Sequence, residues 1–382
     1  MATNPQHCGY ENSHATTANN ILEFCSANCD AGEMATDETA APAPPIPHKR
    51  RVRYAGKHPR RFEEKYKEQQ PGRYAQTVAK VLASGKTPAG MHRPVMVAEI
   101  LEALAPRPGE VAVDCTLGFA GHAQELLARI QPGGRLLGLD TDPIELPKAE
   151  ARLRGLGFGA DVFTARRTNF AGLPQALWTA EIKGADLLLA DLGVSSMQLD
   201  DPGRGFSVKN EGPLDMRMNP HRGQPASVLL QSIRVEALQK LLAENADEPY
   251  AAVLAPALAG KLFATTTALA TAVRAALPRL NKEDGADSIR RVFQSLRIEV
   301  NDEFSALETL LRHLPACLNP SGRAAVLTFH SGEDRRVKKS FAAGLREGIY
   351  EEVSGVLRPG TEERRANPRC APAKLRWVRR AI

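Results

Sequence analysis

The stretch from Asp114 to His122 combines residue types that could bind a nucleotide-like ligand. It reads Asp-Cys-Thr-Leu-Gly-Phe-Ala-Gly-His and lies between an apolar run at 111–113 and a segment, 123–130, with apolar residues at helical spacing. A strand that passes through a glycine-containing turn into a helix presents backbone N–H groups to such a ligand. The sequence therefore predicts a ligand-binding loop here.

A second carboxylate follows where a ribose would be held. Residues 135–140 read Arg-Leu-Leu-Gly-Leu-Asp, which predicts an apolar strand ending at Asp140. An acidic residue about twenty positions after the loop accepts hydrogen bonds from ribose hydroxyls in dinucleotide-binding proteins. The loop and Asp140 together indicate a nucleotide-like cofactor and leave its chemistry open.

The elements that position these groups alternate between helix and strand from Met91 onward. Residues 95–104 have amphipathic helical spacing, and strands are expected at 111–114, 135–140, 161–165, 186–191 and 323–329. This alternation predicts an α/β fold with a doubly wound parallel sheet and a ligand at the carboxyl ends of its strands. Residues 201–300 lack clear strand patterns, so we expect them to form an inserted helical domain.

Length and composition indicate a globular protein of the cytoplasm. The chain has 382 residues, of which 43% are hydrophobic and 25% charged. It contains neither a secretion signal nor an apolar run of the roughly 18 residues that a membrane span needs. Its six cysteines are scattered, as is typical of reduced thiols.

Charge is distributed unevenly along the chain. Residues 1–47 hold six acids and no Lys or Arg, and we expect them to be a disordered acidic tail. Residues 48–90 are expected to be a basic, helical accessory arm, because 48–67 hold nine Lys or Arg against two acids. The last nineteen residues hold seven Lys or Arg and no acid, which predicts a basic tail. The two basic segments favour a nucleic-acid partner, with solvated, solubilising segments as the alternative.

No metal site is expected. His7, Cys8, His14, Cys25 and Cys29 carry zinc-binding side chains, but their spacing matches no zinc finger. The surrounding sequence also provides no apolar core that would order them.

Four further motifs are too particular for general α/β packing. They are Asp191-Leu-Gly-Val-Ser-Ser196, Gly203-Arg-Gly-Phe206, Gly212-Pro-Leu-Asp-Met-Arg-Met218 and Phe329-His-Ser-Gly-Glu-Asp-Arg335. Through these motifs, the chain from His92 to about Arg376 resembles the bacterial 16S ribosomal RNA cytosine-N4 methyltransferases, the RsmH or MraW family, with an additional N-terminal extension.

The resemblance implies a class I methyltransferase sheet and S-adenosyl-L-methionine as cofactor. The methyltransferase domain would comprise 91–200 and 301–382, with 201–300 recognising the substrate. The substrate would be a cytosine N4 amine in the decoding region of 16S ribosomal RNA, either naked or in the assembled small subunit. Monomer and homodimer both remain open. The family's cofactor-binding residues correspond here to Ala120, Gly121, His122, Asp140, Phe170, Asp191 and Gln198.

Methyl transfer to cytosine requires a flipped base and an acceptor for the N4 proton. We expect Asp191, or a carbonyl beside it, to be that acceptor. His330 and Ser331 would line the pocket, and Phe206 or Phe329 would stack on the base. The alternative is that these strand-end groups form a hydrogen-bond cluster that only fixes the fold.

The chain departs from the family pattern at two places. Ala120 replaces a glycine, which matters if φ must be positive or if the cofactor touches that Cα. Residues 247–259 are rich in alanine where relatives carry arginines, so we expect weaker contact with RNA phosphates there, with the arm at 48–67 compensating. These departures leave two alternatives open. One is a divergent paralogue that methylates another RNA cytosine, and the other is a catalytically inactive RNA- or ribosome-binding protein.

Overall fold

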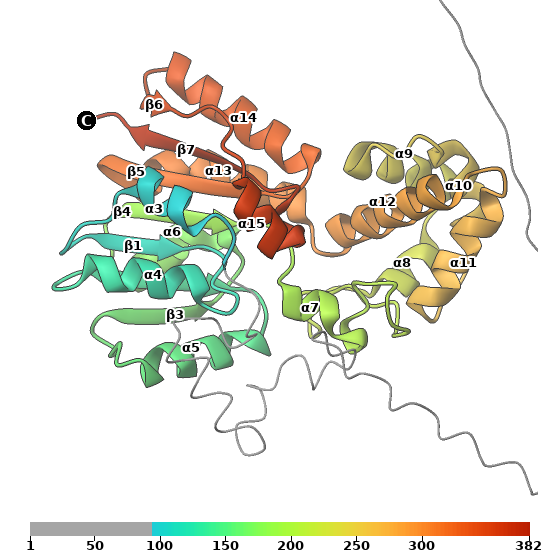
Figure 1. Cartoon of the computed structure of the whole chain (residues 1–382), viewed down its shortest axis with the longest axis horizontal. Helices are drawn as coiled ribbons and strands as arrows, with labels where there is room; N and C mark the ends of the chain where they lie inside the picture. Colours follow the sequence, from blue (N-terminus) through green and yellow to red (C-terminus); the bar gives the residue numbers. More distant parts are fainter. Residues whose placement is uncertain (1–93) are drawn as a thin grey trace, which may run out of the picture. The chain divides into compact units, whose positions relative to one another are not determined.

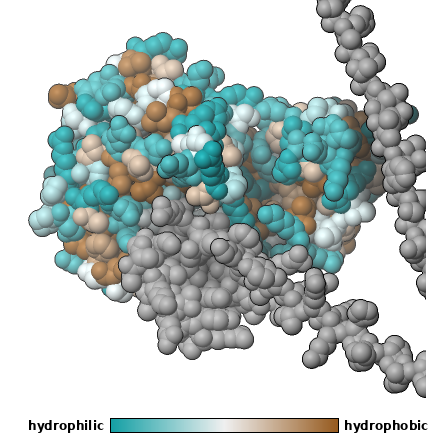
Figure 2. Space-filling view, in the orientation of Figure 1, coloured by the Kyte–Doolittle hydropathy of each residue, from teal (hydrophilic) through white to brown (hydrophobic). Residues whose placement is uncertain are grey.

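The structure is a computed structural model that describes residues 94–382 (Figure 1). The acidic segment 1–47, the basic arm 48–90 and the candidate zinc ligands lie outside the described residues. Within residues 94–382, no helix combines the length and apolar character needed to cross a membrane. The face shown in Figure 2 is largely hydrophilic, with separate hydrophobic patches.

Seven strands form one sheet in the order β3-β2-β1-β4-β5-β7-β6. Neighbouring strands are parallel except at β7, which runs antiparallel to both β5 and β6. This arrangement confirms the expected class I methyltransferase sheet. The strands are β1 (Val111–Asp114), β2 (Arg135–Asp140), β3 (Phe163–Arg167), β4 (Ala185–Asp191), β5 (Leu318–Thr328), β6 (Tyr350–Val353) and β7 (Lys374–Arg380).

The basic C-terminal segment is part of the sheet, so the expectation of a tail is wrong. Residues 374–380 form β7, whose Leu375 and Val378 are fully buried. Its cations are largely paired within the fold. Arg376 Nε donates to Asp334 Oδ1 at 2.7 Å, and Lys374 Nζ donates to Asp334 Oδ2 at 3.1 Å. These pairs reduce the charge that β7 offers to a nucleic acid.

Helices cover both faces of the sheet. α3 (Val97–Leu104), α4 (Gly121–Ile130) and α5 (Glu145–Gly155) pack on one face. α6 (Leu173–Thr179), α13 (Glu303–Cys317) and α14 (Ser331–Arg346) pack on the other. Adjacent strand residues point to opposite faces, so Ala112 belongs to the first hydrophobic cluster and Val113 to the second. α15 (Thr361–Ala366) and a 3₁₀ turn, η4 (Pro368–Cys370), precede β7.

The segment between β4 and β5 is helical, as expected, and has a hydrophobic cluster of its own. After α7 (Ser196–Asp200) and η3 (Pro202–Arg204) come α8 (Ala226–Ser232), α9 (Val235–Ala246), α10 (Ala251–Leu258), α11 (Thr266–Ala276) and α12 (Lys282–Val300). The apolar side chains of α10 that are buried there, Leu254 and Leu258 among them, hold it in this cluster. α13 then leads back into β5 (Figure 1).

Candidate active site

A cavity of about 740 Å³ lies at the carboxyl ends of β1, β2 and β4. The strand-end carboxylates Asp114, Asp140 and Asp191 all line it. The helical insert contributes Met218, and the C-terminal part of α12 contributes Arg297. The predicted location of the ligand site therefore coincides with a real cavity.

Asp140 is held at the edge of this cavity by two backbone groups. Gly118 N–H donates to its Oδ2 at 2.7 Å, and Asp142 N–H donates to its Oδ1 at 2.8 Å. Burial raises the pKa of Asp140 to about 6. Because each carboxylate oxygen can accept a second hydrogen bond, Asp140 retains acceptor capacity for a pair of ribose hydroxyls.

Ala120 adopts the backbone conformation that makes its replacement of glycine costly. Its φ is 63°, in the left-handed region, where a Cβ costs about 1–2 kcal/mol. Its side chain is fully buried in the cluster beneath α4, and Ala120 is absent from the residues that line the cavity. The strain expected for a positive φ is therefore present. The methyl group does not line the cavity.

The two residues after Ala120 do line the cavity. Gly121 begins α4, and His122 lies in its first turn. His122 Nε2 donates to the carbonyl of Val95 at 3.1 Å, and burial lowers the pKa of the ring to about 4. His122 is therefore neutral at physiological pH, and its side chain ties α4 to the segment before α3.

Phe170 and Gln198 also line the cavity, but they differ in what remains free for a ligand. Phe170 begins a 3₁₀ turn, η2 (Phe170–Gly172), and presents a partly buried apolar ring. Gln198 has both amide atoms engaged. Its Oε1 accepts from Ser195 N–H at 2.9 Å, and its Nε2 donates to Asp142 Oδ2 at 2.8 Å.

Asp191 ends β4 with its carboxylate unbonded by any residue of the described chain. Burial raises its pKa to about 8, and the nearby charges of Asp114 and Glu333 add to the shift. Burial likewise raises the pKa of Asp114 to about 7. The carboxylate of Asp191 lines the cavity without a protein donor, and carboxylates with perturbed pKa values concentrate at functional sites.

His330 and Ser331 do not line the cavity, so that expectation is wrong. The His330 ring centroid lies 5.7 Å from that of Phe304, and its Nε2 lies 3.2 Å from Glu333 Oε1. Ser331 Oγ donates instead to Asp247 of the insert at 3.0 Å. The chain turns into α14 at this point, so the two side chains contact α13 and the insert instead.

The two aromatic candidates for base stacking are likewise separated by the structure. Phe206 is buried in the hydrophobic cluster of the insert and does not line the cavity. Phe329 does line it, directly after β5. Of the two, only Phe329 is placed to contact a bound base.

The sequence interpretation missed Glu333, which does reach the cavity. Its side chain is 2% exposed, and its Oε2 accepts from Phe329 N–H at 2.8 Å. Burial raises its pKa, but the hydrogen bond and charge of His330 and the charge of Arg297 outweigh this, so the pKa lies below the usual range. Glu333 is therefore ionised at neutral pH. The sequence feature that could have identified Glu333 as a site residue is its place in the motif 329–335.

A pair of partly buried charges completes this side of the cavity. Arg297 Nε and Nη2 donate to the two oxygens of Glu303, each at 2.8 Å. Among residues 94–382, Glu303, His330 and Glu333 form a group with ligand atoms within 4.8 Å of one another, as a metal site would need. Arg297 already neutralises Glu303, so the negative charge that remains in this group is that of Glu333.

The sheet order and the carboxylate-lined cavity define the chain as a class I methyltransferase. Its family follows from sequence comparison: the profile of the MraW methylase family matches residues 89–381, and the chain belongs to this family. Two relatives are similar over nearly their whole length. The ribosomal RNA small subunit methyltransferase H 2 of Alkaliphilus metalliredigens is 48% identical over 87% of this chain and 97% of its own. The methyltransferase H 1 of Lachnoclostridium phytofermentans is 46% identical over 87% and 93%.

A third relative matches a smaller share of this chain, and the difference concerns its N-terminal part. The methyltransferase H of Symbiobacterium thermophilum is 39% identical over 75% of this chain and 96% of its own. The 87% matched by the first two exceeds what residues 89–381 provide, so their alignments reach into the basic segment before residue 89. Part of the segment expected to lie outside the family core is therefore shared with these relatives.

Proposed function

We propose that this protein transfers the methyl group of S-adenosyl-L-methionine to the N4 amine of a cytosine in small-subunit ribosomal RNA. The observation that carries the proposal is a cavity that is lined both by Asp140 at the end of β2 and by Asp191 at the end of β4. Family membership supplies the class of reaction. The names of the relatives, which are ribosomal RNA small subunit methyltransferases, support the substrate.

The residues present fit the cofactor. Asp140 retains acceptor capacity for ribose hydroxyls, and Phe170 offers an apolar wall for adenine. Gly121 and His122 place backbone N–H groups of the α4 N-terminus at the cavity, where a carboxylate is favourable. When bound, the cofactor supplies an electrophilic methyl group on a positively charged sulfur. The carboxylates that line the cavity favour that charge.

Asp191 would act on the substrate amine. Its unbonded carboxylate is placed to accept a hydrogen bond from N4–H of a flipped cytosine, which draws electron density back onto the nitrogen. As N4 takes the methyl group, the bond from that group to sulfur is lost and S-adenosylhomocysteine is left as product. A proton leaves N4, and a carboxylate with a pKa of about 8 retains it well. Glu333 adds a fixed negative charge on the same side, and Phe329 lies where it could stack on the base.

The helical segment 201–300 would recognise the RNA, and the decoding region of 16S ribosomal RNA is the proposed target. We further propose that the protein works in the cytoplasm on naked RNA or on the assembled subunit. Either substrate leaves the chemistry of Asp191 unchanged.

One observation favours a second candidate, a paralogue that methylates another RNA cytosine. The exposed side of α10 bears Ala252, Val253 and Pro256, and the whole helix carries neither Lys nor Arg. A surface without cations contributes little to phosphate binding. RNA would then dock differently from relatives with a basic helix there. An inactive binding protein is disfavoured because Asp140 and Asp191 both remain in place.

The test is transfer of labelled methyl from S-adenosylmethionine to purified 30S subunits and, separately, to naked 16S ribosomal RNA. Nucleoside analysis of the product should yield N4-methylated cytidine, and the Asp191→Asn variant should yield about a hundredfold less, or lower still, in the same time. A label on another nucleoside would contradict the proposal. A label on a cytosine outside the decoding region would favour the paralogue.

A further inference from the structure

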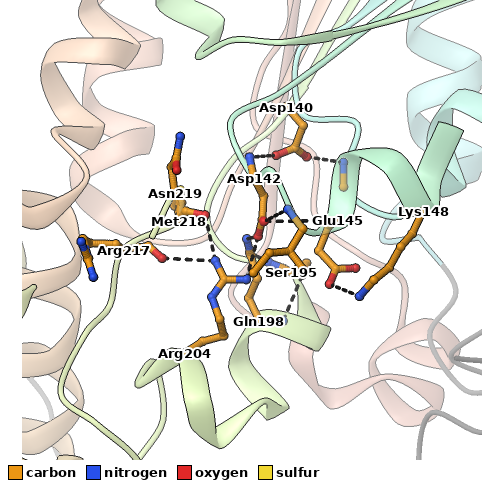
Figure 3. Close-up of polar contacts among 12 residues, drawn as sticks. Asp140, Asp142, Glu145, Lys148, Ser195, Gln198, Arg204, Arg217, Met218 and Asn219 are labelled. Carbon is orange, nitrogen blue, oxygen red and sulfur yellow. Dashed lines mark hydrogen bonds and ion pairs between the residues drawn. The ribbon is translucent and has the colours of Figure 1, made fainter. Parts of the chain in front are cut away.

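Beneath the cavity lies a carboxylate whose hydrogen-bonding capacity is fully used. Asp142 is fully buried, and its Oδ1 accepts from the N–H groups of Ile144 and Glu145 at 2.8 and 3.3 Å. Its Oδ2 accepts from Gln198 Nε2 and Arg204 Nη1, both at 2.8 Å. With four donors, two for each oxygen, Asp142 has no capacity left for a ligand. Its role is to hold other groups (Figure 3).

Arg204 extends this contact into the insert. Its guanidinium is buried, and its Nη2 donates to the carbonyls of Arg217 and Met218 at 3.2 and 2.8 Å. One planar side chain therefore joins Asp142 to the segment 215–218 (Figure 3). A lysine in its place would have one ammonium group and could not donate to Asp142 and to the two backbone carbonyls in the same planar geometry.

The segment that Arg204 holds forms part of the cavity wall and is locally strained. Met218 lines the cavity, while Met216 has a φ of 65°, which is unfavourable for a residue with a side chain. Asn301 holds both from the other side. Its Nδ2 donates to the Met216 carbonyl, and its Oδ1 accepts from Met218 N–H. A strained segment persists only where surrounding contacts determine it, and Arg204 supplies two of them.

At its other end the same network reaches the residue proposed to bind ribose. Asp142 N–H donates to Asp140 Oδ1. The Asp140 carboxylate, which would contact the cofactor, is therefore hydrogen-bonded to the same residue that pairs with Arg204. Asp140 and Met218 are thus connected through Asp142 and Arg204. All of these contacts are buried or partly buried, which limits competition from water.

We propose that Arg204 is a positioning residue that couples cofactor occupancy at Asp140 to the order of residues 203–218. The inference rests on the proposed function, since it takes Asp140 to be a cofactor contact. Binding at Asp140 fixes the backbone at 140–142, which fixes Asp142 and, through Arg204, the wall segment around Met218. Coupling of this kind is reciprocal, so an ordered segment also strengthens cofactor binding.

The experiment is hydrogen–deuterium exchange of the full chain with and without S-adenosylhomocysteine, the reaction product, whose binding is measured by calorimetry. In the wild type, the bound product should slow exchange within 203–218 about tenfold. In Arg204→Gln, this protection should be lost, and the product should bind about tenfold more weakly because the coupling is reciprocal. Arg204→Lys, which keeps the charge facing Asp142, should retain part of both effects. The matched control Arg129→Gln, which removes an exposed ion pair with Glu125, should behave as wild type.

The outcomes separate the inference from the proposed function. If the wild type does not bind S-adenosylhomocysteine, the proposed function fails. If it binds but exchange within 203–218 is unchanged, or if Arg204→Gln keeps full protection, the coupling is refuted. A purely structural role would speed exchange in 203–218 equally with and without product, and this also contradicts the inference. Should Arg204→Gln not melt cooperatively, the same comparison is made with Arg204→Lys, for which full wild-type protection would refute the coupling.

Discussion

Two carboxylates near the ends of β2 and β4 are used in opposite ways. At β2, Asp142 accepts four hydrogen bonds, so its charge is fully compensated. At β4, Asp191 accepts none from residues 94–382, and burial raises its pKa to about 8. The saturated group carries structure, and the unsaturated group is available for chemistry. The distinction depends on counting donors and on exposure, because Asp142 is fully buried whereas Asp191 is partly buried and lines the cavity.

Removing the charge of Asp142 should have the largest effect on stability. Asp142→Asn leaves the buried Arg204 guanidinium without its counter-charge, and breaking a buried pair from one side costs about 3–5 kcal/mol. Urea unfolding should therefore show a free energy of unfolding lower by about that amount. Glu150→Gln, which removes a surface pair with Arg154, is the control and should change it by less than about 1 kcal/mol. If Asp142→Asn and Glu150→Gln lowered the free energy of unfolding equally, Asp142 would not have the structural role that distinguishes it from Asp191.

Asp191→Asn should affect chemistry without harming the fold. Single-turnover methyl transfer should fall by about 10²-fold or more, as expected for loss of an acid–base group. The free energy of unfolding should not decrease, because the substitution removes a buried carboxylate that is costly to ionise. A variant that keeps its methyl-transfer rate would assign the proton acceptor elsewhere, with Glu333 the next candidate.

The pH profile sharpens the same contrast. Asp191 must be ionised to accept the N4 proton, and its pKa is raised to about 8, so the rate should fall as pH decreases below about 8, approaching tenfold per unit. Single-turnover rates measured between about pH 6 and 9 test this. A wild-type rate independent of pH would exclude the proposed role of Asp191.

The smallest effect is expected at Ala120. Ala120→Gly relieves the left-handed strain but makes the unfolded chain more flexible, so the net gain in unfolding free energy should be about 0.5 kcal/mol. The control Ala128→Gly, at an exposed position of the same helix, should instead lose about 1 kcal/mol. Thermal unfolding of the two variants should shift in opposite directions, and shifts in the same direction would contradict the strain at Ala120.

Much of the fold was predictable from local pattern. The apolar runs at 111–114 and 135–140 coincide with β1 and β2, and the helical pattern of 201–300 is confirmed. β5 begins at Leu318, five residues before its predicted start at 323, because Asn-Pro-Ser-Gly interrupts the apolar pattern. β7 was missed since Arg and Lys surround its buried Leu375 and Val378, and their partners lie far away in the sequence.

The site residues could be predicted where their position at the end of a strand alone places them at the cavity. Asp140 and Asp191 follow directly from strands that end at one edge of the sheet. His330 and Glu333 could not be told apart, because the turn into α14 decides which side chain faces the cavity. The importance of Asp142 depends on partners 56 and 62 positions away, Gln198 and Arg204, which no local pattern reveals.

The position of β7 has a consequence for the order in which the strands of the sheet can pair during synthesis. β7 comes last along the chain, yet it lies between β5 and β6 and bonds to both. Until those residues emerge from the translating ribosome, β5 has an open edge that can pair with other chains. A product that stops shortly before Lys374 would therefore be prone to aggregate, even though every residue lining the cavity had already been made.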